Sequence, residues 1–280
     1  MKLLYAAAAT PQFALWKALT VGVLICLTTV PAYGQQNDHE LGRKRFARWI
    51  YQDAGSAFQR KYPYAPVYVA GGLTAFGVLN FVDRWAADEL PEGYKGFLRD
   101  YADVTNNFGG PLANIPVVGI FAISLATPYE RFQDAAFTSM ETVLYAGAIN
   151  YSLKFFFGRV RPEDTDNPLI FVLFSGNSSF PSGHANAAFS ILTPWVMYYP
   201  HPVTYALLVV GAGGTAIARI SRQKHWFSDV FIGSALGFAT GRWLSMRHQR
   251  MTGDRPGGLD LSIHPVGGID QRGIGLTLTF

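Results

Sequence analysis

Residues 180–189 read FPSGHANAAF, a short polar turn that leads directly into an apolar, helix-like run. Ser182 stands where an N-cap residue would stand, because a serine side chain can accept hydrogen bonds from the free N–H groups of a helix start. The same helix start attracts anions, and Gly183 lets a ligand approach the backbone. His184 can carry a proton near neutral pH. The segment predicts an anion-binding cradle with a proton donor beside it; a capped helix with a surface histidine is the alternative.

Upstream, residues 154–162 read KFFFGRVRP and end an apolar segment. Lys154 offers a compact positive charge, and Arg161 offers a planar set of donors that matches phosphate oxygens. The pair therefore suits oxyanion binding. Taken alone, the spacing is also typical of a helix end whose basic residues, including Arg159, reach toward lipid headgroups.

Downstream, residues 218–229 read ARISRQKHWFSD. His225 and Asp229 are four residues apart, which places both on one face of a helix. We expect Asp229 to accept a hydrogen bond from one imidazole nitrogen and to leave the other nitrogen as a nucleophile. A purely structural histidine and aspartate at a helix start is the alternative for this cluster alone.

The three clusters occur in a fixed order, with 18 residues between Pro162 and Pro181 and 34 residues between His184 and Arg219. Together they resemble the tripartite signature of the type 2 phosphatidic acid phosphatase and vanadium haloperoxidase superfamily. The resemblance covers about residues 130–245 and implies an all-α helical bundle. It leaves the N-terminal and C-terminal segments unexplained.

The resemblance also implies a role for each site residue and requires neither a metal nor another cofactor. His225 would attack phosphorus, Asp229 would orient His225, and His184 would protonate the leaving alkoxide. The phosphate oxygens would be held by the Lys154, Arg161 and Arg219 side chains, by the Ser182 side chain and by the Gly183 N–H.

Spacing decides between two candidate arginines in the third cluster. The superfamily pattern has a Ser-Arg pair, which Ser221-Arg222 imitates, but its arginine lies six positions before the nucleophilic histidine. That position is Arg219, and Ala218 precedes it where the superfamily usually has serine. We therefore expect Arg219 to bind phosphate and Arg222 to be peripheral.

By this resemblance the chain is a metal-independent phosphatase of a lipid phosphate or diphosphate that works through a phosphohistidine. Three alternatives stay open: a soluble-type exported acid phosphatase, a vanadium haloperoxidase, and a non-catalytic envelope protein that binds lipid phosphate. The expected partners are the phosphate ester and a membrane, with no nucleic acid and no identifiable protein partner.

Composition sets few limits on these alternatives. A net charge of +4 suits nucleic acid, anionic lipid or a phosphorylated substrate equally well. Cys26 is the single cysteine, so an intrachain disulfide is excluded. Hydrophobic residues make up 49% of the chain and charged residues 15%, which lies on the apolar side of soluble proteins.

Long apolar segments with helical character, and without strand-like alternation, fill the middle of the chain. They predict a helical bundle that is membrane-embedded or membrane-associated, because several are close to the minimum length of about 17 residues for a bilayer span. Buried helices of a wholly exported, peripherally attached bundle would look similar. The segments are residues 65–82, 111–127, 135–153, 185–199, 203–218 and 226–244.

The chain divides into four parts on this basis. Residues 1–34 resemble an export signal with cleavage after Gly34. Residues 35–63 form a basic amphipathic helix, which could lie on anionic lipid or pack on the domain. Residues 64–250 form the phosphatase domain, and residues 251–280 alternate like a β-hairpin tail.

Charge patterning predicts a cell-envelope protein whose site faces the periplasmic or extracellular side. The segment 83–103 carries an excess of acids, which suits an outer face, and the segment 242–255 is basic, which suits an inner one. If the signal is cleaved, residues 35–64 lie outside, and the site would then face the inner side unless one apolar segment does not cross the membrane. A wholly exported bundle avoids this conflict between the two predictions.

Overall fold

In the computed structural model, the described residues, 38–59, 65–92, 95–254, 260–267 and 272–279, fold mainly into helices. All six predicted apolar segments are helical, which confirms the mainly helical prediction. The predicted signal segment, residues 1–34, lies outside the described residues. The longer helices are α2 (Lys44–Gln59), α3 (Ala65–Glu92), α4 (Phe97–Thr105), α5 (Asn114–Ser124), α6 (Glu130–Phe157), α7 (Gly183–Tyr198), α9 (Gly213–Ser221) and α10 (Phe227–Met251).

Short helical turns join these helices. A π-helical stretch, η4 (Leu207–Ala212), connects α8 (Pro202–Ala206) to α9, so residues 202–221 form one helical run. The remaining turns are η1 (Asp38–Leu41), η2 (Asn106–Gly109) and η3 (Pro111–Ala113).

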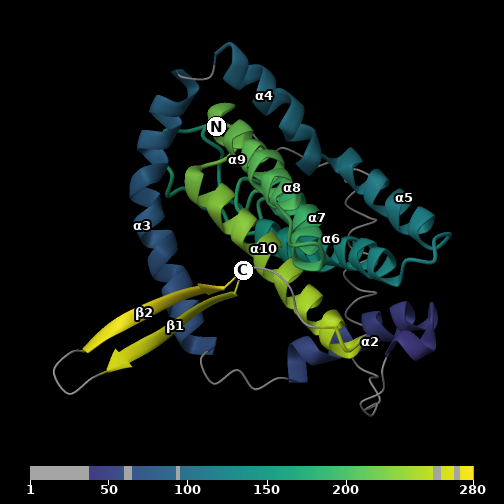
Figure 1. Cartoon of the computed structure of the whole chain (residues 1–280). Coiled ribbons are helices and arrows are strands. Elements are labelled where there is room, and N and C mark those ends of the chain that lie inside the picture. Colours follow the sequence, from purple (N-terminus) through teal and green to yellow (C-terminus); the bar gives the residue numbers. More distant parts are fainter. Residues whose placement is uncertain (1–37, 60–64, 93–94, 255–259, 268–271, 280) are drawn as a thin grey trace.

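The centre of the bundle is formed by α6, α7 and α10, which pack against one another, while α3, α4 and α5 lie around them (Figure 1). Glycines on α10 allow its close approach to α7. A Cβ at Gly233 would lie 2.4 Å from the Ser182 carbonyl oxygen, and one at Gly237 would lie 2.4 Å from the Asn186 carbonyl oxygen. These positions bring the start of α7 against α10, which follows His225.

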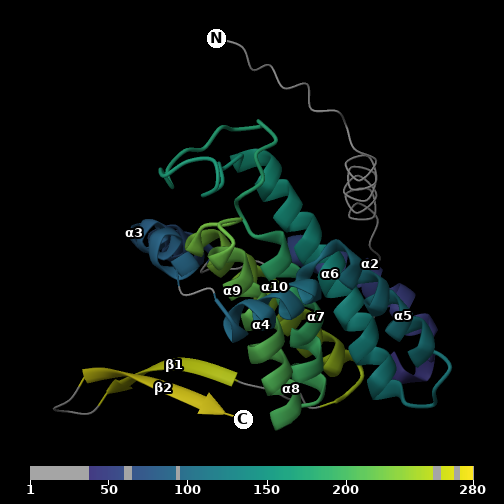
Figure 2. The same cartoon turned by 90° about the horizontal axis from the view of Figure 1, so that it is seen from above.

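The basic amphipathic segment forms α2, and its apolar face packs on the domain. Phe46 and Trp49 are buried in a cluster with Phe137 of α6. Figure 2 views the bundle from above, with α2, α5 and α6 on the same side.

One helical run among the described residues, Pro202–Ser221, is long and apolar enough to cross a membrane. The pair Phe97–Gly109 and Asn114–Ser124, bent by 59°, is a second candidate if it is counted as one broken span. Membrane embedding of the whole bundle is therefore only weakly indicated.

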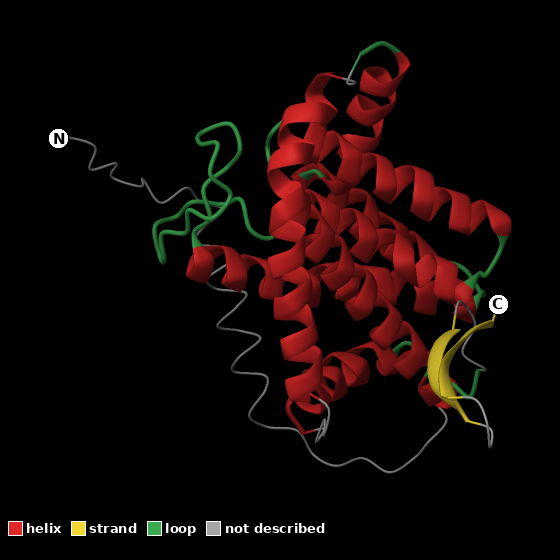
Figure 3. Cartoon of the chain, turned by 90° about the vertical axis from the view of Figure 1, so that its left-hand side faces the viewer, coloured by secondary structure: helices red, strands yellow, loops and turns green. Residues whose placement is uncertain are grey.

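The C-terminal strands β1 (Asp260–Gly267) and β2 (Arg272–Thr279) pair with each other in an antiparallel ladder (Figure 3). The register pairs Asp260 with Thr279 and Gly267 with Arg272.

Candidate active site

The two upstream cations lie at and just beyond the C-terminus of α6. Lys154 is in its last turn, and Gly158 ends the helix in the left-handed conformation, φ 54°. A Cβ there would lie 1.9 Å from the Val172 carbonyl oxygen, so the position requires glycine. Beyond it, Arg161 donates to the Ser178 hydroxyl at 3.0 Å, while Lys154 Nζ donates to the Ser178 carbonyl at 2.6 Å. Both cations therefore converge on Ser178, three residues before Pro181.

The start of α7 lies beside Lys154, as the superfamily resemblance implies. Ser182 is the N-cap, and its hydroxyl accepts a hydrogen bond from the Ala185 N–H at 3.5 Å. A Cβ at Gly183 would lie 3.6 Å from Lys154 Cε, so the glycine backbone is next to this cation. Ser182 is fully buried, and its side chain thus has a capping role as well as the predicted place in the cradle.

His225 is buried, and its orientation differs from the one expected. Its Nδ1 lies 2.7 Å from the Ser179 carbonyl oxygen, whereas Asp229 Oδ2 is 3.9 Å from the same nitrogen. The expected direct hydrogen bond from the imidazole to Asp229 is therefore wrong in this geometry. Because a carbonyl only accepts, Nδ1 carries the proton, and Nε2 keeps its lone pair when the ring is neutral. The predicted nucleophilic nitrogen is thus available, with a different orienting group.

Asp229 acts on the loop that orients His225. Its Oδ2 accepts from the Ser179 hydroxyl at 2.5 Å and from the Trp226 N–H at 3.0 Å. The second contact caps the start of α10. Asp229 therefore holds both the residue before α10 and the residue whose carbonyl fixes the imidazole.

Arg159 also joins this network; the sequence analysis gave it no role in the site and named it only among basic residues that could reach lipid headgroups. It is fully buried and donates to Asp229 Oδ1 at 2.5 Å and to Asp83 Oδ2 at 2.7 Å. Asp83, on α3, also accepts from the Ser228 N–H at 2.7 Å. The available signal was the position of Arg159 between Lys154 and Arg161, but no pattern pointed to Asp83.

Arg219 lies at the inner face of α9, as the spacing predicts. One of its terminal nitrogens donates to Asn106 Oδ1 at 3.3 Å, and its Nε is buried without a hydrogen-bond partner among the described residues. Arg222 is partly exposed and forms an ion pair with Asp103. The structure thus separates an inward arginine with spare donor capacity from a peripheral one.

The positive charges converge on His225. Burial, then Lys154, Arg219 and Arg161, hold the pKa of His225 well below its ordinary value. The ring is therefore neutral near pH 7, which is the state a nucleophile requires.

The same charges act on His184 at the start of α7. Burial and the neighbouring cations, Arg219 and Lys154 foremost, lower the pKa of His184 to about 4. Burial also lowers the pKa of Lys154 to about 7, against the opposing charge of Asp229. An anion in this cluster would offset the repulsion between cations and raise these pKa values.

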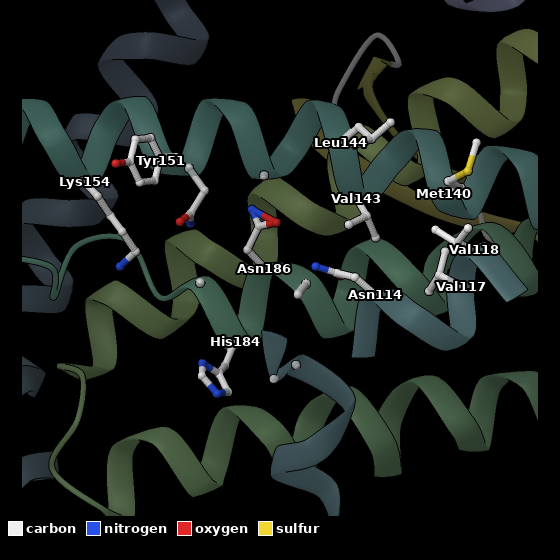
Figure 4. Close-up of a pocket in the computed structure, with 16 residues that line it drawn as sticks. Asn114, Val117, Val118, Met140, Val143, Leu144, Tyr151, Lys154, His184 and Asn186 are labelled. Carbon is white, nitrogen blue, oxygen red and sulfur yellow. The ribbon is translucent and has the colours of Figure 1, made fainter. Parts of the chain in front are cut away.

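A cavity of about 520 Å³ opens from His184 and Lys154 between α5 and α6. Figure 4 shows its polar end at Lys154, Tyr151 and His184, and apolar side chains farther along. These apolar lining residues include Val117, Val118, Met140, Val143 and Leu144. The cavity therefore joins a cationic cluster to an apolar compartment.

The three sequence clusters lie near one another, because Lys154, Arg161 and Arg219 act electrostatically on both His184 and His225 and the Ser182 N–H donates to the Asp229 carbonyl. Residues 135–252 match the PAP2 superfamily. This part of the chain is a PAP2 superfamily domain. The Lipid A 1-phosphatase of Porphyromonas gingivalis is 34% identical over 108 residues, which are 36% of this chain and 22% of that relative. The chain thus matches less than a quarter of the relative's length, and no solved structure matches it significantly.

The PAP2 match begins after α3, so it excludes Asp83 although this residue is bonded to the site. Ala218, the departure from the usual serine, is fully buried. Because alanine has no hydroxyl, position 218 cannot give Arg219 or the phosphate the hydrogen bond that a serine could give.

Proposed function

We propose that this protein is a phosphatase that hydrolyses a lipid phosphate through a phosphohistidine formed on His225. The observation that carries the proposal is a buried, neutral imidazole with a fixed proton on Nδ1, set among Lys154, Arg161 and Arg219. A binding protein would need the cations, but it would not need an oriented nucleophile.

In the first step, Nε2 of His225 forms a bond to phosphorus while the bond from phosphorus to the ester oxygen breaks. His184 gives its proton to the departing oxygen. Binding of the anionic substrate raises the pKa of His184 from about 4, so the proton is present when it is needed. Water then attacks phosphorus, His184 takes a proton from this water, and the N–P bond breaks to release inorganic phosphate.

The cations stabilise the charge that develops on the phosphoryl oxygens. They are preorganised by bonds to the backbone and to neighbouring side chains rather than by the substrate. Removing one such donor from an enzyme site typically lowers the rate by about a hundredfold to a thousandfold. Asp229 is a positioning residue here, because it acts through Ser179, Trp226 and Arg159.

A lipid phosphate is favoured over a small ester because of the cavity. A small phosphate ester would use only its polar end, whereas an acyl chain could lie along Val143, Leu144 and Met140. The relative named Lipid A 1-phosphatase supports the same substrate class.

A lipid substrate also places the protein at a membrane of the cell envelope. Large apolar side chains are exposed on α3, α4 and η3, with Phe81 87%, Phe97 81% and Leu112 75% exposed. Exposed apolar surface on this scale is typical of contact with lipid or protein. A site on the periplasmic or extracellular side remains a prediction from the charge pattern.

The test measures phosphate release in EDTA from a lipid phosphate in detergent and from a soluble aryl phosphate. Wild type is compared with His225→Ala and with His201→Ala, an equal change at an exposed histidine. We expect wild type and His201→Ala to prefer the lipid and His225→Ala to release no phosphate.

Each other outcome favours a different function. A preference for the aryl ester would support a soluble-type acid phosphatase. Full activity of His225→Ala would show that His225 is not the nucleophile. If wild type releases no phosphate, vanadate-dependent halide oxidation or binding without catalysis becomes the favoured function.

A further inference from the structure

A second cluster of ionisable groups lies far from the phosphate cradle. It consists of Asp53 on α2, Glu141 on α6 and His248 on α10, which are 0%, 1% and 0% exposed. One ligand atom from each lies within 4.8 Å of the others. Glu141 precedes Lys154 by thirteen residues on the same helix, so about 20 Å of helix separates the two sites.

Glu141 is the member of the cluster that points to a missing ligand. Both carboxylate oxygens are buried, and neither has a hydrogen-bond partner among the described residues. Leaving a buried polar group in this condition is unfavourable, and more so if the group is charged. Because the carboxylate of Asp53 also lies in this cluster, the ionised Glu141 carboxylate needs a positive charge beside it. The Glu141 carboxylate must therefore bind a cation or a proton.

His248 is oriented in the way that metal-binding histidines usually are. Thr138 gives its hydroxyl proton to the Asp134 carbonyl at 2.6 Å and so accepts from His248 Nδ1 at 2.8 Å. This fixes the proton on Nδ1 and directs Nε2 at the two carboxylates, 2.7 Å from Asp53 and 3.4 Å from Glu141. Trp49 stacks on the ring at 4.0 Å. A hydrogen bond to the far nitrogen of a ligating histidine, together with packing on its ring, holds the ring in place.

We propose that Asp53, Glu141 and His248 bind one divalent transition ion, and that Zn²⁺ fits this site best. One imidazole nitrogen and two carboxylate oxygens are ligands that Zn²⁺ accepts at about 2.0 to 2.2 Å. Ligand atoms at such bond lengths in a tetrahedron stand about 3.4 Å apart. The His248–Glu141 distance of 3.4 Å already fits, and the Asp53–His248 pair would open by roughly 0.7 Å.

The ion would be structural, because it would join three helices that are distant in sequence. Arg247 forms an ion pair with the second oxygen of Asp53 and would hold this ligand from outside. The site would fasten α2 to α6 and α10 without contacting the phosphate cradle. Phosphatase activity and metal binding are therefore separate readouts.

The test uses the full chain with any affinity tag removed, stripped with a chelator and dialysed against micromolar Zn²⁺. Bound zinc is measured by elemental analysis, and thermal unfolding is followed with and without Zn²⁺. Wild type is compared with Glu141→Gln, which keeps the shape of the side chain, and with Glu89→Gln on the exposed surface of α3. Asp53→Asn serves as a second ligand variant.

We expect one zinc per chain in wild type and Glu89→Gln, with a raised unfolding temperature. Glu141→Gln and Asp53→Asn should bind zinc at least about tenfold more weakly and show little stabilisation by it. Zinc uptake by Glu141→Gln equal to that of wild type would overturn the site. A wild type that binds no zinc would also overturn it and would leave a proton shared between His248 and Glu141 as the explanation. If neither ligand variant folds, the wild-type stoichiometry and its Zn²⁺-dependent unfolding decide.

Discussion

His225 Nδ1 lies 2.7 Å from the carbonyl oxygen of Ser179, so a backbone acceptor fixes the orientation of the imidazole. The carboxylate of Asp229 reaches the same ring only through the side chain of Ser179 and the backbone of Trp226. Orientation of the proposed nucleophile thus depends on a loop, and this loop depends on a buried ion pair.

Because the Ser179 carbonyl and the Asp229 carboxylate orient His225 in different ways, Ser179→Ala and Asp229→Asn should lower kcat by different amounts. Ser179→Ala removes a hydroxyl but keeps the carbonyl, so we expect kcat to fall by about tenfold or less, the size of one hydrogen bond. Asp229→Asn weakens the loop, the cap of α10 and the pair with Arg159, and should lower kcat by more than about a hundredfold. Steady-state kinetics on the lipid substrate checks both. Equal losses in the two variants would show that the hydroxyl, not the carbonyl, positions His225.

Arg159 should matter chiefly for stability. Arg159→Met leaves Asp83 and Asp229 buried without their shared cation, and we expect the free energy of unfolding to fall by about 3 to 5 kcal/mol. Glu163→Gln removes an exposed partner of Lys224 and should change it by less than about 1 kcal/mol. Chemical denaturation followed by circular dichroism measures both. Similar values for the two variants would contradict the buried network.

Anion binding should be accompanied by proton uptake. Sulfate stays a dianion in mild acid, so at about pH 5.5 any protons taken up on binding go to the protein and not to the sulfate. His184 is mostly neutral there, since its pKa is about 4, and a bound dianion raises this pKa. Titration calorimetry in two buffers of different ionisation enthalpy measures the uptake. It should shrink in His184→Asn, and an unchanged uptake would assign the proton to another group.

The same shift sets a pH dependence of stability. The unfolded histidine takes up a proton below about pH 6.5, whereas folded His184 does so only below about pH 4. Between these values the unfolded state binds more protons, so the contribution of His184 to stability decreases as pH falls from about 6.5 to about 4. Sulfate should restore part of this loss in unfolding curves of wild type and less of it in His184→Asn. No difference between the two would contradict the shift.

Close packing of α7 and α10 predicts that Gly233→Ala is harmful. The added Cβ would meet the Ser182 carbonyl at 2.4 Å and push the start of α7 away from His225. We expect lower kcat and an unfolding free energy lower by about 1 to 3 kcal/mol. Gly213→Ala meets nothing within 4 Å and should keep the activity, with unchanged or higher stability. Activity and thermal unfolding of both variants, measured together, decide.

The cavity predicts a variant that distinguishes substrates. Gly147 lines its wall on α6, so Gly147→Leu fills part of the space without touching the cationic end. KM for a lipid phosphate should rise at least about tenfold, while kcat/KM for an aryl phosphate should change little. Parallel kinetics on the two substrates is the measurement. If kcat/KM falls equally for the lipid phosphate and the aryl phosphate, the cavity does not hold the lipid chain.

Much of the site could be predicted from local spacing. Lys154, Arg161, Ser182, Gly183, His184, Arg219, His225 and Asp229 all lie near helix ends, where a short motif determines the direction of the side chain. The choice of Arg219 over Arg222 also came from spacing, and their different burial agrees with it.

What could not be predicted depends on contacts between distant segments. Asp83 precedes Arg159 by 76 residues and lies on a helix with no motif of its own. The acceptor for His225 is a main-chain carbonyl, and any residue type at position 179 supplies one. The role of Arg159 could not be predicted, because a cation among aromatic residues has the same sequence pattern whether it faces lipid or a buried carboxylate.

The bond between Asp83 and Arg159 also shows that the buried network under the site extends beyond the residues that match the superfamily. The part of the chain that matches the PAP2 superfamily begins at residue 135, whereas the helix that supplies Asp83 ends at residue 92. A fragment that begins at residue 135 would carry all three motifs but would lack Asp83, one of the two carboxylate partners of the buried Arg159. The segment that matches the superfamily is therefore shorter than the segment from which the buried network under the site is built.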